Sequence, residues 1–227
     1  GKVLKKTLQI PVQVNDPEVV RISRLELKSG ETFTFDGNVF ADLVPGSGKA
    51  TMAVGPLARL NAPGLLAALD RYPYGCTEQM TSRALPLIYF DEVAKVMDLK
   101  GAEDLQKRID EAVVEILANQ SSSGAFGLWG PAEGDFWLDA YVTDFLSRAK
   151  AQGYQVPELA LRNALANLRN QVNYAPDFTS DVNGGGEALA YALMVLAREG
   201  AAAVGDLRYY ADVKGDDFST PIAQAQL

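Results

Sequence analysis

The 227-residue sequence contains no histidine and a single cysteine, Cys76. The missing histidine excludes Ser-His-Asp and Cys-His catalysis, and any histidine-ligated zinc site, within this chain. The single cysteine excludes a disulfide framework inside the chain. Together these absences argue against a structural metal cluster, and we expect neither a metal nor a cofactor.

Basic residues and long apolar runs are also scarce. The net charge is −8 and the pI is near 4.7, whereas a nucleic-acid-binding protein needs a basic surface, so we expect no nucleic-acid partner. No apolar run approaches the roughly 18 residues of a membrane span. No charged-then-apolar leader opens the sequence. The sequence therefore indicates neither a compartment nor a membrane anchor.

The cysteine lies in a short motif, Tyr-Gly-Cys-Thr-Glu-Gln, at residues 74–79. Cys76 and Gln79 are three residues apart, so the sulfur can reach the side-chain carbonyl if the segment turns like a helix. Displacement of ammonia from the Gln79 amide by Cys76 Sγ would close a ring of roughly fifteen atoms, an internal thioester. The alternative is that Cys76 is a small buried apolar side chain without chemistry.

The flanking residues extend this motif. Residues 71–87 have the sequence R-Y-P-Y-G-C-T-E-Q-M-T-S-R-A-L-P-L. This segment resembles the thioester segment of the alpha-2-macroglobulin and complement family, and it is most similar to the bacterial branch. The resemblance also covers residues 22–90 and 124–200. It implies that Cys76 and Gln79 form a thioester.

A thioester stores an acyl group for one transfer. Its carbonyl is less resonance-stabilised than that of an amide, and a thiolate leaves readily. A lysine amine or a water molecule can attack Gln79 Cδ and release Cys76 as a thiol, so that Gln79 becomes bonded to the attacking molecule. Because the acyl group is used once, we do not expect an enzyme.

The residues around the pair are candidates for supporting the bond, which persists only where water is kept away. Tyr72, Tyr74 and Met80 are candidates for shielding it, with ordinary packing as the alternative. Gly75 is expected to allow the close backbone approach that the ring requires. Glu78 is expected to cap the helix that follows.

The missing histidine also bears on the acceptor. In complement-type members of the family, a histidine beyond a Trp-Leu-x-Ala-Tyr-Val stretch takes over the acyl group and directs it to hydroxyls. Here that stretch is residues 137–142, and the region after it, 175–186, contains no histidine. The resemblance therefore implies direct attack by amines, as in the protease-trapping members.

The pattern along the chain changes near residue 55. Polar and apolar residues alternate before it and predict strands over 7–14, 19–27, 32–35 and 49–54. Helical periodicity follows it. Residues 57–69 are rich in Ala and Leu but interrupted by Pro63-Gly64. The predicted helices cover 77–96 with a break at Pro86, 102–119, 135–152, 157–172 and 187–199.

We therefore predict a mainly α-helical chain. By resemblance, residues 1–55 are the first part of a CUB-like, β-sandwich-like half domain, and residues 56–227 are the N-terminal part of an incomplete α/α toroid of paired helices. Residues 223–227 fall in a predicted helix well short of a closed ring, so we expect a fragment of a longer protein. Apolar helix faces at its open edge would favour self-association.

A weak repeat supports the paired helices. Ala140-Tyr141 recurs fifty residues later as Ala190-Tyr191, and Arg148 recurs as Arg198. The alternative is that Ala/Leu-rich helices resemble one another without a repeat.

Two further groups of side chains, one aromatic and one acidic, are candidate sites. Trp129, Phe136, Trp137 and Tyr141 are interpreted as core packing rather than as a wall beside a reactive group. A second set consists of acidic residues that alternate with apolar ones, which indicates a solvated helix face rather than a metal site. Its members are Glu133, Asp135, Asp139 and Asp144.

The resemblance implies a function. It indicates the thioester-bearing module of a bacterial alpha-2-macroglobulin, a broad-spectrum endopeptidase inhibitor that traps proteases and links them to Gln79 through lysine amines. It also implies a periplasmic location, an inner-membrane anchor in the full-length parent, and contacts with other domains of that parent. A structural fragment without an active thioester stays open. An enzyme of the prenyltransferase or terpene-cyclase kind would need a zinc or acidic magnesium site, for which we find no motif.

Overall fold

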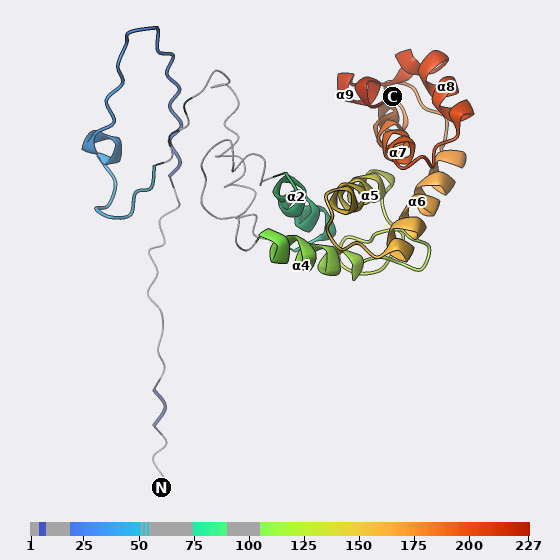
Figure 1. The fold of residues 1–227 in the computed structure, drawn as a ribbon, viewed down its shortest axis with the longest axis horizontal. Coiled ribbons are helices and arrows are strands. Elements are labelled where there is room, and N and C mark those ends of the chain that lie inside the picture. The colour runs from blue at the N-terminus through green and yellow to red at the C-terminus, as the bar shows by residue number, and fades with distance from the viewer. Residues whose placement is uncertain (1–4, 8–18, 51, 53, 55–74, 90–104) are drawn as a thin grey trace. The chain divides into compact units, whose positions relative to one another are not determined.

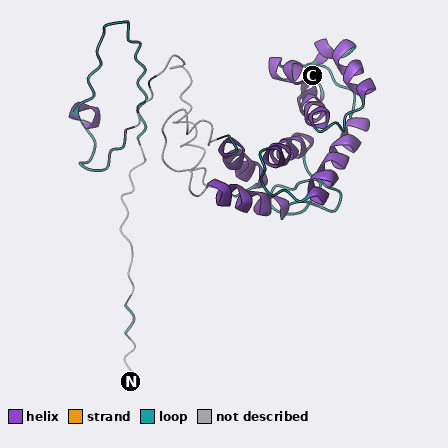
Figure 2. Cartoon of the chain, in the orientation of Figure 1, coloured by secondary structure: helices purple, strands orange, loops and turns teal. Residues whose placement is uncertain are grey.

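The computed structural model describes residues 5–7, 19–50, 52, 54, 75–89 and 105–227 (Figure 1). The chain divides into two compact units, Gly1–Asn61 and Ala62–Leu227. The described part is mainly α-helical, as predicted, and it contains seven α-helices and no β-strand (Figure 2). Each unit is described by itself.

The described part of the first unit does not form the predicted strands. Residues 19–27 and 32–35 are extended without strand pairing, and the regular element here is the 3-10 helix η1, Gly37–Phe40. A strand needs a neighbour for its backbone hydrogen bonds and a partner surface for its apolar face. Neither is provided among the described residues, since Val20 is 73% exposed and Ile22 is 68% exposed. The strand predictions for 19–27 and 32–35 are therefore wrong.

The strand predicted at 7–14 lies outside the described residues except for residue 7, and the Ala/Leu-rich segment 57–69 lies wholly outside them. Of the strand predicted at 49–54, residues 49, 50, 52 and 54 are described, and none of them is in a strand. The CUB-like, β-sandwich-like character of residues 1–55 stays a prediction.

The second unit contains all seven helices. Their bounds are α2 Thr77–Leu87, α4 Leu105–Leu117, α5 Phe136–Ala151, α6 Glu158–Asn173, α7 Glu187–Arg198, α8 Val204–Asp212 and α9 Pro221–Gln226. Two 3-10 helices, η3 Asn183–Gly186 and η4 Gly215–Asp217, lie between the later ones. None of the described helices is both long enough and apolar enough to cross a membrane.

Most predicted helices agree with these bounds to within a few residues. Helix α2 ends at Leu87, directly after Pro86, and residues 90–96 of the predicted helix lie outside the described part. Helix α8 was not predicted. It has no buried residue and its N-cap, Ala203, offers no side-chain cap, so the usual sequence signals are missing.

Apolar periodicity explains why α4 forms and where it packs. Leu105, Ile109, Val113 and Ile116 recur at helical spacing and are at most 5% exposed, while the opposite face carries charged residues. Asp135 caps α5, since its side chain accepts hydrogen bonds from Trp137 N (3.0 Å) and Leu138 N (3.2 Å).

Helix α5 lies between α2 and α7 (Figure 1). Helix α4 packs against α2 and α5, and α6 packs against α5 and α7. Helix α5 contacts both α2 and α7 and contributes to two apolar cores. Phe145 and Leu146 belong to the core shared with α2 and α4, and Ala140 belongs to the core shared with α6 and α7. Closure of such helices into a toroid stays a prediction.

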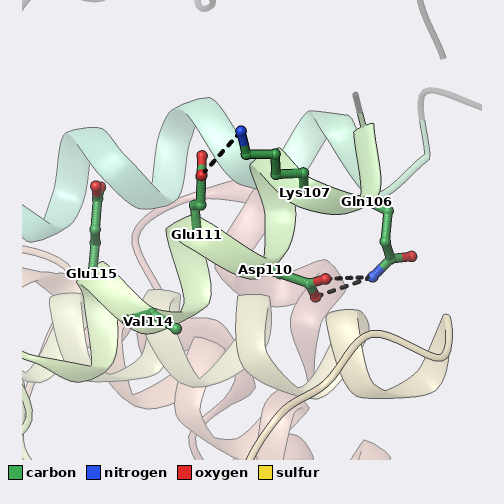
Figure 3. A pocket seen from close by; sticks show the side chains of 6 residues that line it. All are labelled: Gln106, Lys107, Asp110, Glu111, Val114 and Glu115. Carbon is green, nitrogen blue, oxygen red and sulfur yellow. Dashed lines mark hydrogen bonds and ion pairs between the residues drawn. The ribbon is translucent and has the colours of Figure 1, made fainter. Parts of the chain in front are cut away.

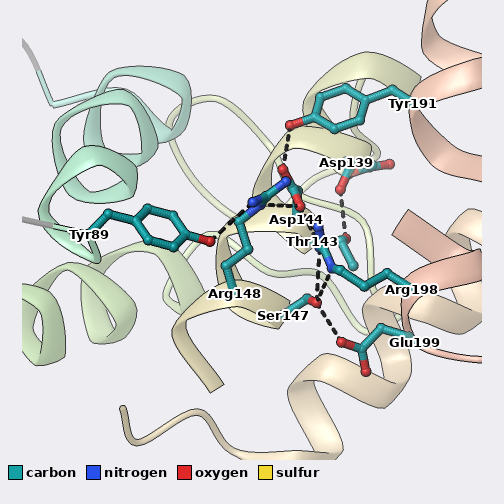
Figure 4. A network of polar contacts seen from close by, with 9 residues as sticks. All are labelled: Tyr89, Asp139, Thr143, Asp144, Ser147, Arg148, Tyr191, Arg198 and Glu199. Carbon is teal, nitrogen blue, oxygen red and sulfur yellow. Dashed lines mark hydrogen bonds and ion pairs between the residues drawn. The ribbon is translucent and has the colours of Figure 1, made fainter. Parts of the chain in front are cut away.

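A buried polar network joins these helices at Asp144, which is 3% exposed (Figure 4). Asp144 Oδ1 accepts hydrogen bonds from Arg148 Nε at 2.8 Å and from Arg198 Nη2, and Oδ2 accepts one from Tyr191 at 2.9 Å. Arg148 also donates to Tyr89 Oη at 3.0 Å. The network thus connects the segment after α2 with α5 and α7.

Arg198 extends the network by donating to Ser147 Oγ, which in turn donates to Glu199 Oε1. The two arginines that the sequence repeat relates, Arg148 and Arg198, therefore bind one carboxylate from adjacent helices. The interpretation of Asp144 as part of a solvated face is wrong, because an ion pair allows this carboxylate to be buried.

We expect Asp144→Ala to lower the free energy of unfolding by about 2–4 kcal/mol, because it leaves two arginines beside the core without their counter-ion. This expected loss lies toward the low end of the range for breaking a buried ion pair, since each arginine side chain is 33% exposed. Urea unfolding followed by tryptophan fluorescence measures it, as both tryptophans, Trp129 and Trp137, lie in the second unit.

Asp177→Ala is the matched control, because it removes the partner of Lys214 from an ion pair whose carboxylate is 82% exposed. We expect a much smaller change there. Equal effects of the two substitutions would contradict a structural role for the buried network.

Candidate functional site

Helix α2 begins directly after Cys76, which occupies its N-cap position with extended backbone angles (φ −73°, ψ 160°). Gln79 is the third residue of the helix. Its side chain folds back toward the helix start, where Oε1 accepts a hydrogen bond from the Cys76 backbone N–H at 3.4 Å. The Gln79 side-chain carbonyl therefore lies at the backbone of the residue that carries the sulfur.

Cys76 and Thr77 are buried at the start of this helix, whereas Gln79 is partly exposed. Cys76 is 7% exposed and Thr77 is fully buried. Met80 packs in the apolar core that α2 shares with α4 and α5. Burial of this kind slows hydrolysis of any acyl bond formed there.

The hydroxyl of Thr77 fixes α2 to the α4–α5 loop, residues 118–135. Thr77 Oγ1 donates to Gly127 O at 2.6 Å, and Thr77 N donates to Leu128 O at 2.9 Å. The same hydroxyl accepts a hydrogen bond from Asn119 Nδ2 at 2.8 Å. The residue next to Cys76 is therefore held at a defined position by a segment more than forty residues away in sequence.

The α4–α5 loop is itself tightly packed. At Gly127 a Cβ atom would overlap Gly130 O, and at Gly134 it would lie 2.5 Å from Phe126 O and 2.6 Å from Asp139 Oδ1. Only glycine fits such close backbone approaches. The carbonyls that bind Thr77 thus belong to a loop with little freedom to move.

Asp139 anchors this loop from α5. Its Oδ1 accepts a hydrogen bond from Phe126 N at 2.7 Å, and its Oδ2 accepts from Asn167 (2.8 Å) and Gln171 (2.6 Å) of α6. Asp139 has no exposed surface, so it too was wrongly interpreted as part of a solvated face. Burial raises the pKa of Asp139, and the three uncharged donors offset only part of that effect.

The structure does not test the roles predicted for three other support residues. Tyr72 and Tyr74 lie outside the described residues. Gly75 is exposed, and a Cβ there would meet no described atom within 4 Å. Their proposed roles stay predictions.

Glu78 lies in the first turn of α2, and its Oε1 accepts a hydrogen bond from Ser82 Oγ at 2.7 Å. This bond is made within α2. The Ser82 hydroxyl also lies 3.0 Å from the Tyr141 hydroxyl of α5.

The predicted aromatic cluster is not a core cluster. Trp129 is 74% exposed and Trp137 is 40% exposed, while Phe136 and Tyr141 are partly buried. Trp137 stacks on Tyr141 with a centroid distance of 4.9 Å. The core interpretation is therefore wrong for both tryptophans, because helical spacing places residues on one face without showing whether that face is covered.

The described residues contain no group of three or more Cys, Asp or Glu that could hold a metal ion. Glu133 and Asp135 are both exposed. A shallow pocket on the outer face of α4 is lined by polar side chains that bind one another, including Gln106 with Asp110 and Lys107 with Glu111 (Figure 3). No residue of the Cys76 motif lines it.

Comparison with known proteins shows the family of the chain. The family model described as the A-macroglobulin TED domain matches residues 49–181, which is more than half of the chain. The chain belongs to the alpha-macroglobulin family. It is similar to the alpha-2-macroglobulin of Escherichia coli K12, with 30% identity over an alignment of 202 residues. The match covers 85% of this chain and 12% of that protein. The chain thus spans only a small part of the length of the relatives that it matches.

Solved structures give the same result. The native E. coli alpha-2-macroglobulin, from domain MG7 to the C-terminus, is similar with a TM-score of 0.64 and 31% identity over 74% of this chain and 27% of that chain. Salmonella alpha-2-macroglobulin reacted with methylamine is similar with a TM-score of 0.59 and 31% identity, over 68% of this chain and 11% of that chain. Trypsin-activated E. coli alpha-2-macroglobulin is similar with a TM-score of 0.56 and 30% identity, over 65% of this chain and 11% of that chain.

The surroundings of two residues, Thr77 and Asp139, are hard to predict from the sequence. Thr77 lies inside the motif, but its partners come from residues 119–128, and sequence does not show which loop meets the helix start. Asp139 lies between the apolar Leu138 and Ala140, but adjacent residues of a helix point to different faces, so its neighbours do not indicate that it is buried.

We expect Thr77→Val to lower the free energy of unfolding by about 1–3 kcal/mol, because it leaves Gly127 O and Asn119 Nδ2 without their buried partner. Thr81→Val is the matched control. Thr81 is equally buried in the same helix, but its hydroxyl donates only to Thr77 O, a helix carbonyl. Urea unfolding compares the two, and a larger effect at Thr81 would contradict the role of the Thr77 contacts.

Proposed function

We propose that the chain is the thioester-bearing module of a bacterial alpha-2-macroglobulin, an endopeptidase inhibitor that links attacking proteases covalently to Gln79. The observation that carries the proposal is the geometry at the start of α2. Cys76 is buried there, and the Gln79 side chain folds back onto its backbone. Holding two reacting groups together in this way replaces a bimolecular encounter with an intramolecular one.

The proposed bond forms when Cys76 Sγ attacks Gln79 Cδ and ammonia leaves. A lysine amine later adds to the same carbon, the C–S bond breaks, and the sulfur leaves with its electron pair and takes up a proton. Gln79 is then joined to the lysine by an amide bond. Since the amide does not react further, each chain acts once, and we propose a covalent trap rather than an enzyme.

The acceptor follows from what the chain contains. It has no histidine that could take over the acyl group, so amines are proposed to attack directly. Two relatives support this choice of nucleophile and partner: the Salmonella protein was solved after reaction with methylamine, and an E. coli structure is described as trypsin-activated. Lysines on the surface of a protease would supply the amine.

Two further features belong to the proposal rather than to the structure. The helices of the second unit are proposed to be part of an α/α toroid, and the parent protein is proposed to lie in the periplasm, anchored to the inner membrane. The partners would be target proteases and the other domains of that parent.

Intact mass under native handling tests the chemistry. We expect the purified chain to be lighter than its sequence mass by one ammonia, and methylamine to add once while freeing one thiol. Cys76→Ala is the control and should show the full sequence mass and no methylamine adduct. An unmodified mass with Cys76 titratable from the start would favour the alternative, a structural domain without an active thioester.

Protease capture is tested with trypsin inactivated at its catalytic serine, so that the chain is not cleaved. We expect a conjugate that survives denaturing electrophoresis with native trypsin. Trypsin with acetylated lysines should form none. Conjugates of equal yield from both preparations would contradict attack by lysine.

A further inference from the structure

The side-chain carbonyl of Gln79 has a hydrogen-bond donor in the backbone of Cys76. Gln79 Oε1 accepts the Cys76 backbone N–H at 3.4 Å, and this contact is partly buried. An N–H group binds the oxygen of a side-chain amide and not its nitrogen, so the nitrogen is the group left free to depart. The oxygen that the Cys76 N–H binds is therefore the atom that stays in the thioester after ammonia has left.

Cys76 and Gln79 have the reciprocal arrangement of a capping box. The Gln79 side chain lies against the Cys76 backbone N–H, and the Cys76 side chain lies against the Gln79 backbone N–H. The carbonyl oxygen and the sulfur thus each face a backbone donor of the other residue. These are the two atoms that gain negative charge during acyl transfer, the oxygen in the tetrahedral intermediate and the sulfur as it leaves.

The three hydroxyl groups of α2 donate to other acceptors. Thr77 Oγ1 donates to Gly127 O, Thr81 Oγ1 donates to Thr77 O, and Ser82 Oγ donates to Glu78 Oε1. No hydroxyl of this helix therefore donates to the Gln79 carbonyl. The backbone N–H of Cys76 is the donor that the start of α2 offers to this oxygen.

The backbone of Cys76 is held on its C-terminal side. Thr77 N donates to Leu128 O at 2.9 Å, and the Cys76 carbonyl accepts from Met80 N at 2.9 Å. The Thr77 hydroxyl fixes the same segment to the α4–α5 loop. A donor that is in place before the reaction stabilises a developing charge without having to reorient, which is the property of an oxyanion hole.

We propose that the backbone N–H of Cys76 is the oxyanion donor of the thioester, both when the bond forms and when an amine opens it. The inference rests on the proposed function and adds to it the group that stabilises the transition state. The backbone N–H of a nucleophile can reach the oxyanion that its own side chain generates, as it does in the serine proteases. The positive end of the α2 dipole acts on the same oxygen, since Cys76 is the N-cap of the helix.

The Cys76 N–H acts on the same oxygen in both directions of the chemistry. In bond formation, Cys76 Sγ adds to Gln79 Cδ, and the electron pair of the C=O bond moves to the oxygen, where the N–H stabilises it. The pair returns as the C–N bond breaks, and ammonia leaves with the proton that the sulfur lost. In aminolysis, a lysine amine adds to the same carbon and gives the same oxyanion. Its collapse breaks the C–S bond, and the sulfur takes up the proton that the nitrogen loses.

Replacement of a single backbone amide by an ester tests the donor, because the ester keeps the side chain and lacks the N–H. We expect an ester at Cys76 to slow the release of the Cys76 thiol by methylamine about 10- to 100-fold. This is below the full effect of removing an oxyanion donor, since the contact is only partly buried. Hydrolysis of the thioester in buffer should slow by the same factor, because it passes through the same oxyanion. Intact mass verifies that the backbone ester survives.

An ester at Met80 is the matched control. It removes the N–H that donates to Cys76 O, so the same helix turn loses one backbone hydrogen bond while the Gln79 carbonyl keeps its donor. We expect both esters to lower the stability in urea, and the Cys76 ester alone to slow acyl transfer. A Cys76 ester that forms no thioester while the Met80 ester does would support the role of the donor in closing the ring. Equal rates in the two ester chains, or faster hydrolysis in the Cys76 ester, would overturn the proposal.

Amide hydrogen exchange decides the question if neither ester chain forms the thioester. The Cys76 amide should exchange slowly in the unaltered, thioester-bearing chain and about fivefold faster or more in Gln79→Ala, the effect of one hydrogen bond. The Met80 amide should stay protected in both chains. Equal exchange of the Cys76 amide in the two chains would overturn the oxyanion donor alone. If the unaltered chain shows its full sequence mass and adds no methylamine, the proposed function itself fails.

Discussion

The position of Cys76 depends on the hydroxyl of Thr77, which lies without exposed surface between α2 and the α4–α5 loop. This one group binds Gly127 O and accepts from Asn119, so two distant parts of the chain meet at the start of the helix. A ring between Cys76 and Gln79 needs both residues held close, and a fraying helix end would not hold them. The Thr77 contacts remove that freedom.

Helix α5 supports this arrangement in three ways. Asp139 holds the α4–α5 loop through Phe126 N, Tyr141 reaches Ser82 on α2, and Asp144 binds arginines of α5 and α7. Apolar residues of the same helix contribute to both cores. The Cys76–Gln79 pair and the rest of the helical unit are therefore coupled through one element, and its buried carboxylates are stable only because each has several hydrogen-bond partners.

The helices were largely predictable, as was the closeness of Cys76 and Gln79 in the chain fold, because both are local. The recurrence of Leu105, Ile109 and Val113 predicts α4, and the spacing of Cys76 and Gln79 predicts their proximity once α2 forms. The errors concern which surfaces are covered. Trp129 and Trp137 are exposed although aromatic, Asp139 and Asp144 are buried although acidic, and residues 19–27 alternate without pairing as a strand. Covering partners come from elsewhere in the chain, and the periodicity of one segment does not show them.

The sequence by itself determined the class of chemistry that we propose. The lone cysteine, the glutamine three residues later and the absence of histidine are facts of composition and spacing. Only the tertiary structure decided the surroundings of that pair. The partners of Thr77 lie more than forty residues away, and the Glu78–Ser82–Tyr141 chain joins two helices. Such contacts depend on helix packing, because hydrogen bonds of this kind require side chains within about 3 Å, and residues distant in sequence come so close only when the chain is folded.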